Sequence, residues 1–111
     1  MKNTTVMQKI KKLVKDNKQI ENFDCYVAYD SIDYVIQAIV DVNINIDWIN
    51  FEYPKYLGQR PLKVKDIINL LKDNNKKGKE ISDDSVMYDL KEITTNNNDF
   101  FFIFKNRWEV R

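Results

Sequence analysis

Apolar side chains occupy every second position through the middle of the chain. All even positions from 34 to 48 are apolar: Tyr34, Ile36, Ala38, Val40, Val42, Ile44, Ile46 and Trp48. A period of two is typical of a β-strand that buries one face, and it predicts Tyr34 and Trp48 in the core. Residues 32–41 also fit a helical stripe, but their β-branched content favours a strand over 33–41. Only the strand period continues over 42–50, so such a long strand needs a bend or turn near Asp41–Asn43.

Two other segments carry apolar residues at helical spacing. In the first, Thr5 and Gln8 have capping-box spacing and Asn17 is suited to end the helix. Its apolar stripe is Val6, Ile10, Leu13 and Val14. The second helix follows the connector 53–62, with Pro61 in its first turn and Gly78 as a left-handed stop. Its apolar stripe is Val64, Ile67, Ile68 and Leu71.

The remaining apolar segments predict further strands. Residues 23–29 combine Tyr, Val and Phe, which suit a pleated sheet. Residues 83–92 fit either a helix that starts near Ser82 or a strand. The run 100–104 is apolar on both faces and therefore predicts a central strand with two neighbours, which favours a strand over 85–93. The sequence TTNNND between them predicts a hairpin turn, because Asn tolerates positive φ.

These elements predict one α+β domain over residues 1–111. We expect a mostly antiparallel sheet of four or five strands with two amphipathic helices on one face, in the order α-β-β(-β)-α-β-β. Apolar residues make up 43% of the chain and aromatic residues 13%, which is enough for a folded core. The single cysteine, Cys25, predicts a reducing environment and a small core residue. With no signal-peptide core and no long apolar run, we expect a cytoplasmic location, in its own cell or in a host cell.

The net charge of +1 hides strong segregation along the chain. Residues 1–20 balance to +5, residues 21–53 to −7, residues 54–80 to +5 and residues 81–111 to −2. The segment 21–53 contains no lysine or arginine at all. Either the basic helices lie across an acidic sheet and neutralise it, or an acidic surface remains for a partner of opposite charge.

Motifs for catalysis are absent from the sequence. There is no histidine and one cysteine, which excludes ordinary zinc sites and Cys–His nucleophiles. Two glycines cannot build a Gly-rich phosphate loop. A carboxylate group at Asp83, Asp84, Asp89 and Glu92 would suit Mg²⁺, but capping and ordinary surface charge explain it better. We therefore expect a protein that is not an enzyme and has no cofactor and no metal.

The acidic, aromatic segment is the most distinctive feature of the chain. In the strand interpretation its polar residues share one face, and aromatic and acidic residues together suit docking on a cationic protein. The predicted partner-binding residues are Tyr29, Asp30, Asp33, Asp41, Asn43, Asn45, Asp47 and Glu52.

The function that we expect from this pattern is that of a small binding or inhibitor protein. Its partner would be a basic protein, such as a nuclease or another nucleic-acid-handling protein. Immunity proteins against nuclease toxins and phage anti-defence inhibitors, including anti-CRISPR proteins, offer an analogy of size and charge. The alternative is a nucleic-acid-binding accessory protein that uses the lysine-rich helices, although a pI of 7.7 is low for direct nucleic-acid binding. Self-association through a strand edge is a further possibility, and nothing predicts contact with a membrane.

Overall fold

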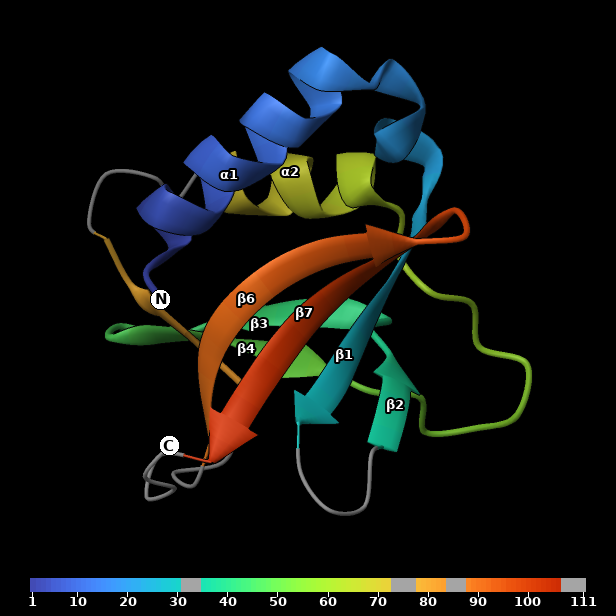
Figure 1. The fold of residues 1–111 in the computed structure, drawn as a ribbon. Coiled ribbons are helices and arrows are strands. Elements are labelled where there is room, and N and C mark those ends of the chain that lie inside the picture. Colours follow the sequence, from blue (N-terminus) through green and yellow to red (C-terminus); the bar gives the residue numbers. More distant parts are fainter. Residues whose placement is uncertain (31–34, 73–77, 84–87, 107–111) are drawn as a thin grey trace.

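The computed structural model describes residues 1–30, 35–72, 78–83 and 88–106. These residues form two helices, one short 3₁₀ helix and seven strands, which confirms the α+β class (Figure 1). In chain order the elements are α1 (Asn3–Asp16), η1 (Lys18–Asn22), β1 (Asp24–Asp30), β2 (Val35–Ala38), β3 (Asp41–Ile44), β4 (Trp48–Glu52), α2 (Val64–Lys72), β5 (Glu80–Ser82), β6 (Tyr88–Asn96) and β7 (Asp99–Asn106).

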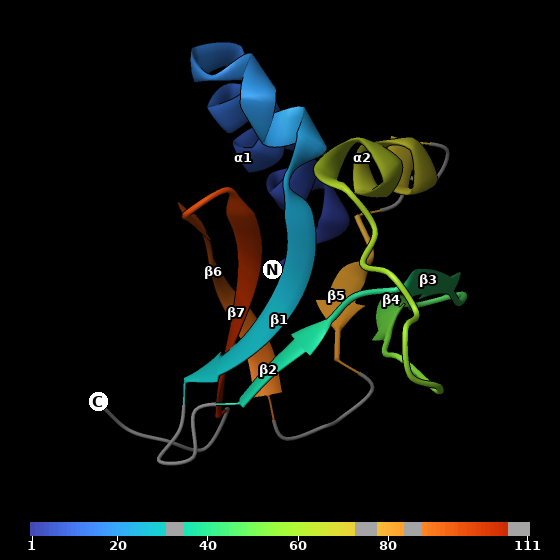
Figure 2. The same ribbon diagram turned by 90° about the vertical axis from the view of Figure 1, so that its right-hand side faces the viewer.

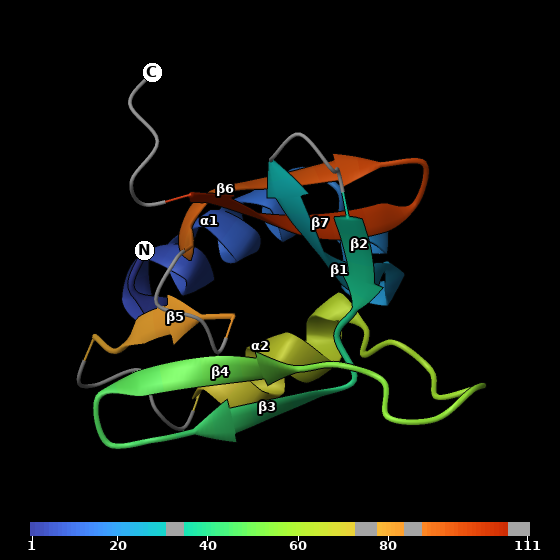
Figure 3. The ribbon, with the colours of Figure 1, turned by 90° about the horizontal axis from the view of Figure 1, so that it is seen from below.

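The strands form two mixed sheets, so the prediction of a single sheet of four or five strands is wrong, although three of the five described strand pairs are antiparallel. The four-stranded sheet has the order β2-β1-β7-β6, and the three-stranded sheet has the order β3-β4-β5. Each sheet contains one parallel pair, β1 with β7 and β4 with β5. A parallel pair needs a crossover connection, and α2 lies in the crossover from β4 to β5. Figures 2 and 3 show the two sheets on opposite sides of the core.

The two sheets share one apolar core with the helices. Alternate residues of β7 point into it, and Phe100, Phe102 and Phe104 are fully buried. The ring of Phe102 meets the ring of Phe51 from β4 edge-on, with centroids 4.8 Å apart. This aromatic contact joins the four-stranded sheet to the three-stranded sheet. The central position predicted for residues 100–104 is confirmed, because β7 lies between β1 and β6.

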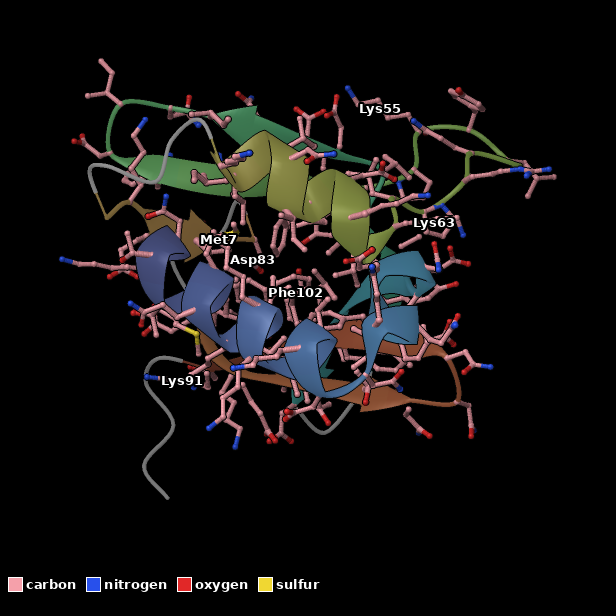
Figure 4. All side chains as sticks on the ribbon, turned by 90° about the horizontal axis from the view of Figure 1, so that it is seen from above. Met7, Lys55, Lys63, Asp83, Lys91 and Phe102 are labelled. Atoms are coloured by element: carbon pink, nitrogen blue, oxygen red, sulfur yellow. The ribbon has the colours of Figure 1, made fainter. Side chains whose placement is uncertain are left out.

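The helices lie side by side over one end of the two sheets (Figures 1 and 4). Their apolar stripes enter the core, where Val6, Ile10 and Ile67 are fully buried. The predicted capping box at Thr5 is wrong: α1 begins at Asn3, because the chain turns into the helix directly from its pairing with β5. At the other end Asn17 terminates α1 as predicted, and its N–H donates to the carbonyl of Leu13.

The second helix begins later than its proline predicts. It starts at Val64, and the backbone N–H of Lys63 donates to Asp66 Oδ2 at 2.9 Å. That contact has the geometry of half a capping box, in which a residue inside the first turn reaches back to the N-cap. Pro61 therefore lies in the connector that precedes the helix, outside its first turn.

The long alternating segment is divided into three strands and two breaks. The helical alternative is wrong for residues 35–38, which form β2, while residues 31–34 lie outside the described part of the chain. The first break follows Ala38, earlier than the bend predicted near Asp41–Asn43. The second is the hairpin turn between β3 and β4, and after it the buried residues are Ile49 and Phe51 at odd positions. Trp48 is consequently 51% exposed, which corrects its predicted place in the core.

The C-terminal hairpin follows the prediction closely. Residues 88–96 form β6, so the strand interpretation is confirmed there and the helical one is wrong, while residues 84–87 lie outside the described residues. Asn97 and Asn98 form the turn with φ of 50° and 69°, in the left-handed region that two-residue hairpin turns require. None of the helices in the described part of the chain is long and apolar enough to cross a membrane.

Candidate functional site

The three-stranded sheet has one face in the core and one face outward. Val42, Ile49 and Phe51 point into the core. Residues that alternate with them form the opposite face, because successive side chains of a strand point to opposite sides. We call this the acidic outer face, and in β3 and β4 it consists of Asp41, Asn43, Trp48, Asn50 and Glu52. Figure 3 shows β3 at the edge of the molecule that lies farthest from β6 and β7.

Two acidic residues occupy opposite positions in neighbouring strands on the acidic outer face. Asp41 and Glu52 are register partners in the antiparallel pair β3–β4. Residues in such register have Cβ atoms about 5 Å apart and their side chains on the same side of the sheet. Like charges in this position repel, so the arrangement costs stability. The sheet therefore keeps two negative charges together on its outward side.

No lysine or arginine in the described residues lies within 4 Å of the carboxylates of Asp41 or Glu52. The basic face of α1 does not reach them, and its lysines are exposed at positions 9, 11, 12 and 15. Within the described residues, the basic helices therefore form no ion pair with Asp41 or Glu52. One oxygen of Asp41 accepts the backbone N–H of Val42 at 2.8 Å, which fixes the carboxylate at the sheet edge.

Positive groups do lie at the margins of this face. Lys79 Nζ donates to the carbonyl of Asn45 in the hairpin turn at 2.7 Å. The N-terminal ammonium of Met1 pairs with Glu80 at 3.0 Å, and Glu80 is the register partner of Trp48. Asn45 and Asp47 thus lie at a turn to which Lys79 already donates a hydrogen bond. Among the described residues, neither Asp41 nor Glu52 forms an ion pair within 4 Å.

The other predicted site residues lie elsewhere. Tyr29 and Asp30 belong to β1 in the four-stranded sheet, so the fold does not bring them to the acidic outer face. Asp30 pairs with Lys105 of β7 at 3.5 Å. Asp33 lies outside the described residues. The sequence pattern missed this division because the alternation of residues 34–48 continues unbroken across two sheets.

Tyr29 belongs to a partly buried polar cluster that the sequence did not predict. Its hydroxyl lies 3.2 Å from the hydroxyl of Tyr53. Burial, followed by the hydrogen bond to Tyr53, raises the pKa of Tyr29 far above its ordinary value. Asp83, which is 6% exposed, is close enough to contribute to the raised pKa of Tyr29. The ring of Tyr88 packs edge-on against Tyr29, with centroids 5.0 Å apart. Figure 4 shows Asp83 toward the middle of the molecule, and the cluster joins the two sheets.

Neither metal binding nor thiol chemistry has support in the described residues. They contain no group of three or more carboxylate or thiol side chains placed to hold a metal ion. Of the predicted carboxylate group, Asp84 lies outside the described residues, and Asp89 contacts Lys91 at 3.9 Å. Cys25 is fully buried, and burial raises the pKa of its thiol, so it is the core residue that the sequence predicts.

No protein-family model, no curated protein and no solved structure matches this chain.

Proposed function

We propose that the protein is a non-enzymatic binding protein whose acidic outer face docks on a cationic surface of another protein. The partner would be a protein that handles nucleic acid, because such proteins carry positive grooves for phosphate. A bound partner would supply the lysine or arginine that the pair Asp41–Glu52 lacks within the described residues. The protein would then compete with nucleic acid for that groove.

One observation supports this proposal above the others. Asp41 and Glu52 are register partners in neighbouring strands, a position in which like charges destabilise a sheet. Surfaces free of functional demands tend to lose such pairs, and proteins depart from stability rules at functional sites. A guanidinium or ammonium group between the two carboxylates would turn the repulsion into attraction.

An apolar anchor lies on the same face. Trp48 is half exposed, and it stands four residues before Glu52 in β4, a separation of about 13 Å along the strand. Tryptophan is enriched among the residues that carry most of the energy of protein interfaces. Ile46 in the adjoining turn is 88% exposed and extends this apolar end. A carboxylate pair at one end and an apolar end at the other would define how a partner is oriented.

The test compares two double variants of equal charge. Asp41→Asn with Glu52→Gln removes the unpaired carboxylates, and the amide oxygen that replaces the carboxylate of Asp41 still accepts the Val42 N–H. Asp24→Asn with Asp30→Asn removes two carboxylates that already pair with Lys63 and Lys105. Partners are first captured with the tagged wild-type protein from its native cells and identified. The purified partner is then titrated with each variant.

We expect the first variant to lose partner binding, with an affinity at least tenfold weaker, because close interfacial charge pairs contribute about 1.5–7 kcal/mol. The second variant should bind as the wild type does. Duplex DNA or RNA should displace the wild-type protein from the partner. Equal binding by both variants would contradict the proposal, as would a partner that binds nucleic acid and this protein independently.

A second candidate function has one observation in its favour. The lysines of α1 are exposed and have no described carboxylate within 4 Å, so that helix would be able to contact phosphates. A gel-shift experiment tests it. Binding of nucleic acid that weakens steeply with salt and is lost in Lys9→Gln with Lys12→Gln would favour this function. No shift at low ionic strength would exclude it.

A further inference from the structure

We propose that strand β2 pairs with β2 of a second copy of this chain, so that the two four-stranded sheets join into one continuous sheet across an antiparallel junction. This inference concerns a different surface from the acidic outer face, and it does not depend on the proposed function. It rests on the state of the four sheet edges, on the chemistry of β2 and on the segment beside it.

The outer edge of β2 carries backbone groups that the described residues leave unpaired. The N–H of Ile39 donates to the carbonyl of Cys25 at 3.0 Å, which continues the antiparallel register of β1 and β2. Because the direction of backbone groups alternates along a strand, Val35 and Gln37 face β1. Ile36 and Ala38 therefore direct their N–H and C=O groups away from the sheet. No described residue hydrogen-bonds to these outward groups.

The other three sheet edges are protected in ways that proteins commonly use against edge pairing. At β3, the carboxylate of Asp41 occupies the outward N–H of Val42. At β5, residues Met1 to Asn3 pair with the edge through hydrogen bonds to Lys79 and Ile81. At β6, charged residues and a bulge between Leu90 and Glu92 interrupt the edge.

Strand β2 has none of these protections within the part of the chain that the structure describes. Its four residues, Val35–Ala38, include no charge and no proline. Val35 is 43% exposed and Ile36 is 49% exposed, although both are apolar. An open, uncharged edge with exposed apolar side chains invites another strand, and unlimited pairing would cause aggregation. Pairing around a two-fold axis consumes both open edges and closes the assembly.

The open edge of β2 is better suited to pair with β2 of a second copy than with any other edge of the molecule. In an antiparallel pair centred on Gln37, the outward groups of Ile36 meet those of Ala38 in the other copy and form four backbone hydrogen bonds. Gln37 then lies opposite its own counterpart, and the amide both donates and accepts. Since β2 has no charge, no like charges oppose each other. At β3 or β6 the same pairing would bring acids or bases of the two copies close together.

Further exposed apolar residues lie beside this edge. The segment 53–62 runs past β2, since Tyr53 at its start meets Tyr29, the register partner of Val35. At its end the N–H of Leu62 donates to the carbonyl of Ile39 at 2.7 Å. Figure 2 shows the segment beside β2 on the side that faces the viewer. Tyr56 is 68% exposed and Leu57 is entirely exposed, so the same side offers apolar contacts to an added strand.

The test is the mass of the protein in solution, measured by light scattering during size-exclusion chromatography over a range of concentrations. The chain mass is 13.3 kDa, and we expect twice this value for the wild type. Gln37→Lys places two ammonium groups opposite each other, and Gln37→Glu places two carboxylates there, so each variant alone should elute as a monomer. An equimolar mixture of the two variants should recover the doubled mass, because the opposed charges then attract.

Asn43→Lys on β3 is the matched control, since it adds the same charge to an exposed edge residue of the other sheet. It should leave the doubled mass unchanged. A wild-type protein that stays monomeric at every concentration would overturn the proposal. So would a dimer that survives Gln37→Lys, or a mixture of the two charged variants that remains monomeric. A normal circular dichroism spectrum of each variant ensures that a lost dimer is not a lost fold.

Discussion

The two sheets of this protein differ in whether their carboxylates are paired with cations. In and beside the four-stranded sheet, Asp24 pairs with Lys63 and Asp30 pairs with Lys105. In the three-stranded sheet, Asp41 is the register partner of Glu52, and no described cation lies within 4 Å of either carboxylate. Both groups of acids come from the same base-free segment of the sequence, residues 21–53. The composition of the segment is therefore not what decides whether its charges are neutralised.

The strand register decides which of these carboxylates lie beside a cation. Asp30 is the register partner of Lys105, because β1 pairs with β7 from the far end of the chain. Asp41 is the register partner of Glu52, because β3 pairs with its neighbour in the same acidic segment. A hairpin within a segment of one charge sign brings like charges together, whereas pairing with a distant strand introduces the opposite sign. The acidic outer face follows from this local pairing.

The largest effect that we predict is the loss of stability when the aromatic contact between the two sheets is removed. Phe102→Ala removes a fully buried ring that packs on Phe51 of the other sheet. Truncation of a buried phenylalanine costs about 3–5 kcal/mol, so the midpoint of urea unfolding should fall strongly.

Phe101→Ala is the control in the adjacent position of the same strand, where the ring is only partly buried and stacks on Tyr26. It should lower the free energy of unfolding clearly less than Phe102→Ala does. Equal losses for the two variants would mean that the interface between the sheets is not the main site of packing.

A smaller effect is expected at the polar cluster that also joins the sheets. Tyr29→Phe removes the hydroxyl that lies 3.2 Å from the hydroxyl of Tyr53, and a hydrogen bond of this kind contributes about 0.5–1.5 kcal/mol. The loss should be visible at neutral pH as a lower free energy of unfolding.

The same variant changes the response of stability to alkaline pH. The pKa of Tyr29 is raised above its ordinary value of 10.0, so the unfolded chain releases this proton at a lower pH than the folded one. Wild-type stability should therefore fall as pH rises above 10, and the fall should be shallower in Tyr29→Phe. Cys25 and Tyr26 also have raised pKa values and should retain part of the decline. An unchanged slope would show that burial does not hold the proton on Tyr29.

Single neutralisations in the two sheets should differ in sign. Asp30→Asn removes half of an ion pair that is partly exposed, so it should lower the free energy of unfolding by at most about 1 kcal/mol. Glu52→Gln removes a repulsion with Asp41 and should leave stability unchanged or slightly raised. Thermal unfolding at low ionic strength measures both. A destabilised Glu52→Gln would indicate that this carboxylate has a favourable partner.

Much of the fold could be predicted from local patterns. The stripe of α1 and the turn at Asn97 and Asn98 each depend on residues close in sequence. The central place of the 100–104 run could be predicted because that run is apolar on both faces. The division into two sheets could not be predicted, because the even-position alternation ignores where a strand ends. Ile39 is fully buried at an odd position, and Trp48 is exposed at an even one. At each break the inward-facing positions change between odd and even, although the apolar alternation in the sequence continues unchanged.

Only part of the candidate site could be predicted, because the sequence alternation does not show where one strand ends and the next begins. Asp41, Asn43 and Glu52 do share a face, since they belong to one hairpin. Tyr29 and Asp30 do not join them, because β1 pairs with β7 in the other sheet. The contact of Tyr29 with Tyr53 joins segments that are 24 residues apart, and no spacing in the sequence indicates it.

The most direct test of the account is the coupling between Asp41 and Glu52 in the isolated protein. A double-mutant cycle with Asp41→Asn, Glu52→Gln and the combined variant isolates their interaction in the free energy of unfolding. We predict a repulsion of about 0.2–1 kcal/mol at low ionic strength that shrinks as salt screens the exposed charges. A coupling that is absent or favourable at low salt would contradict the account, because it would mean that the two carboxylates are already neutralised within the protein.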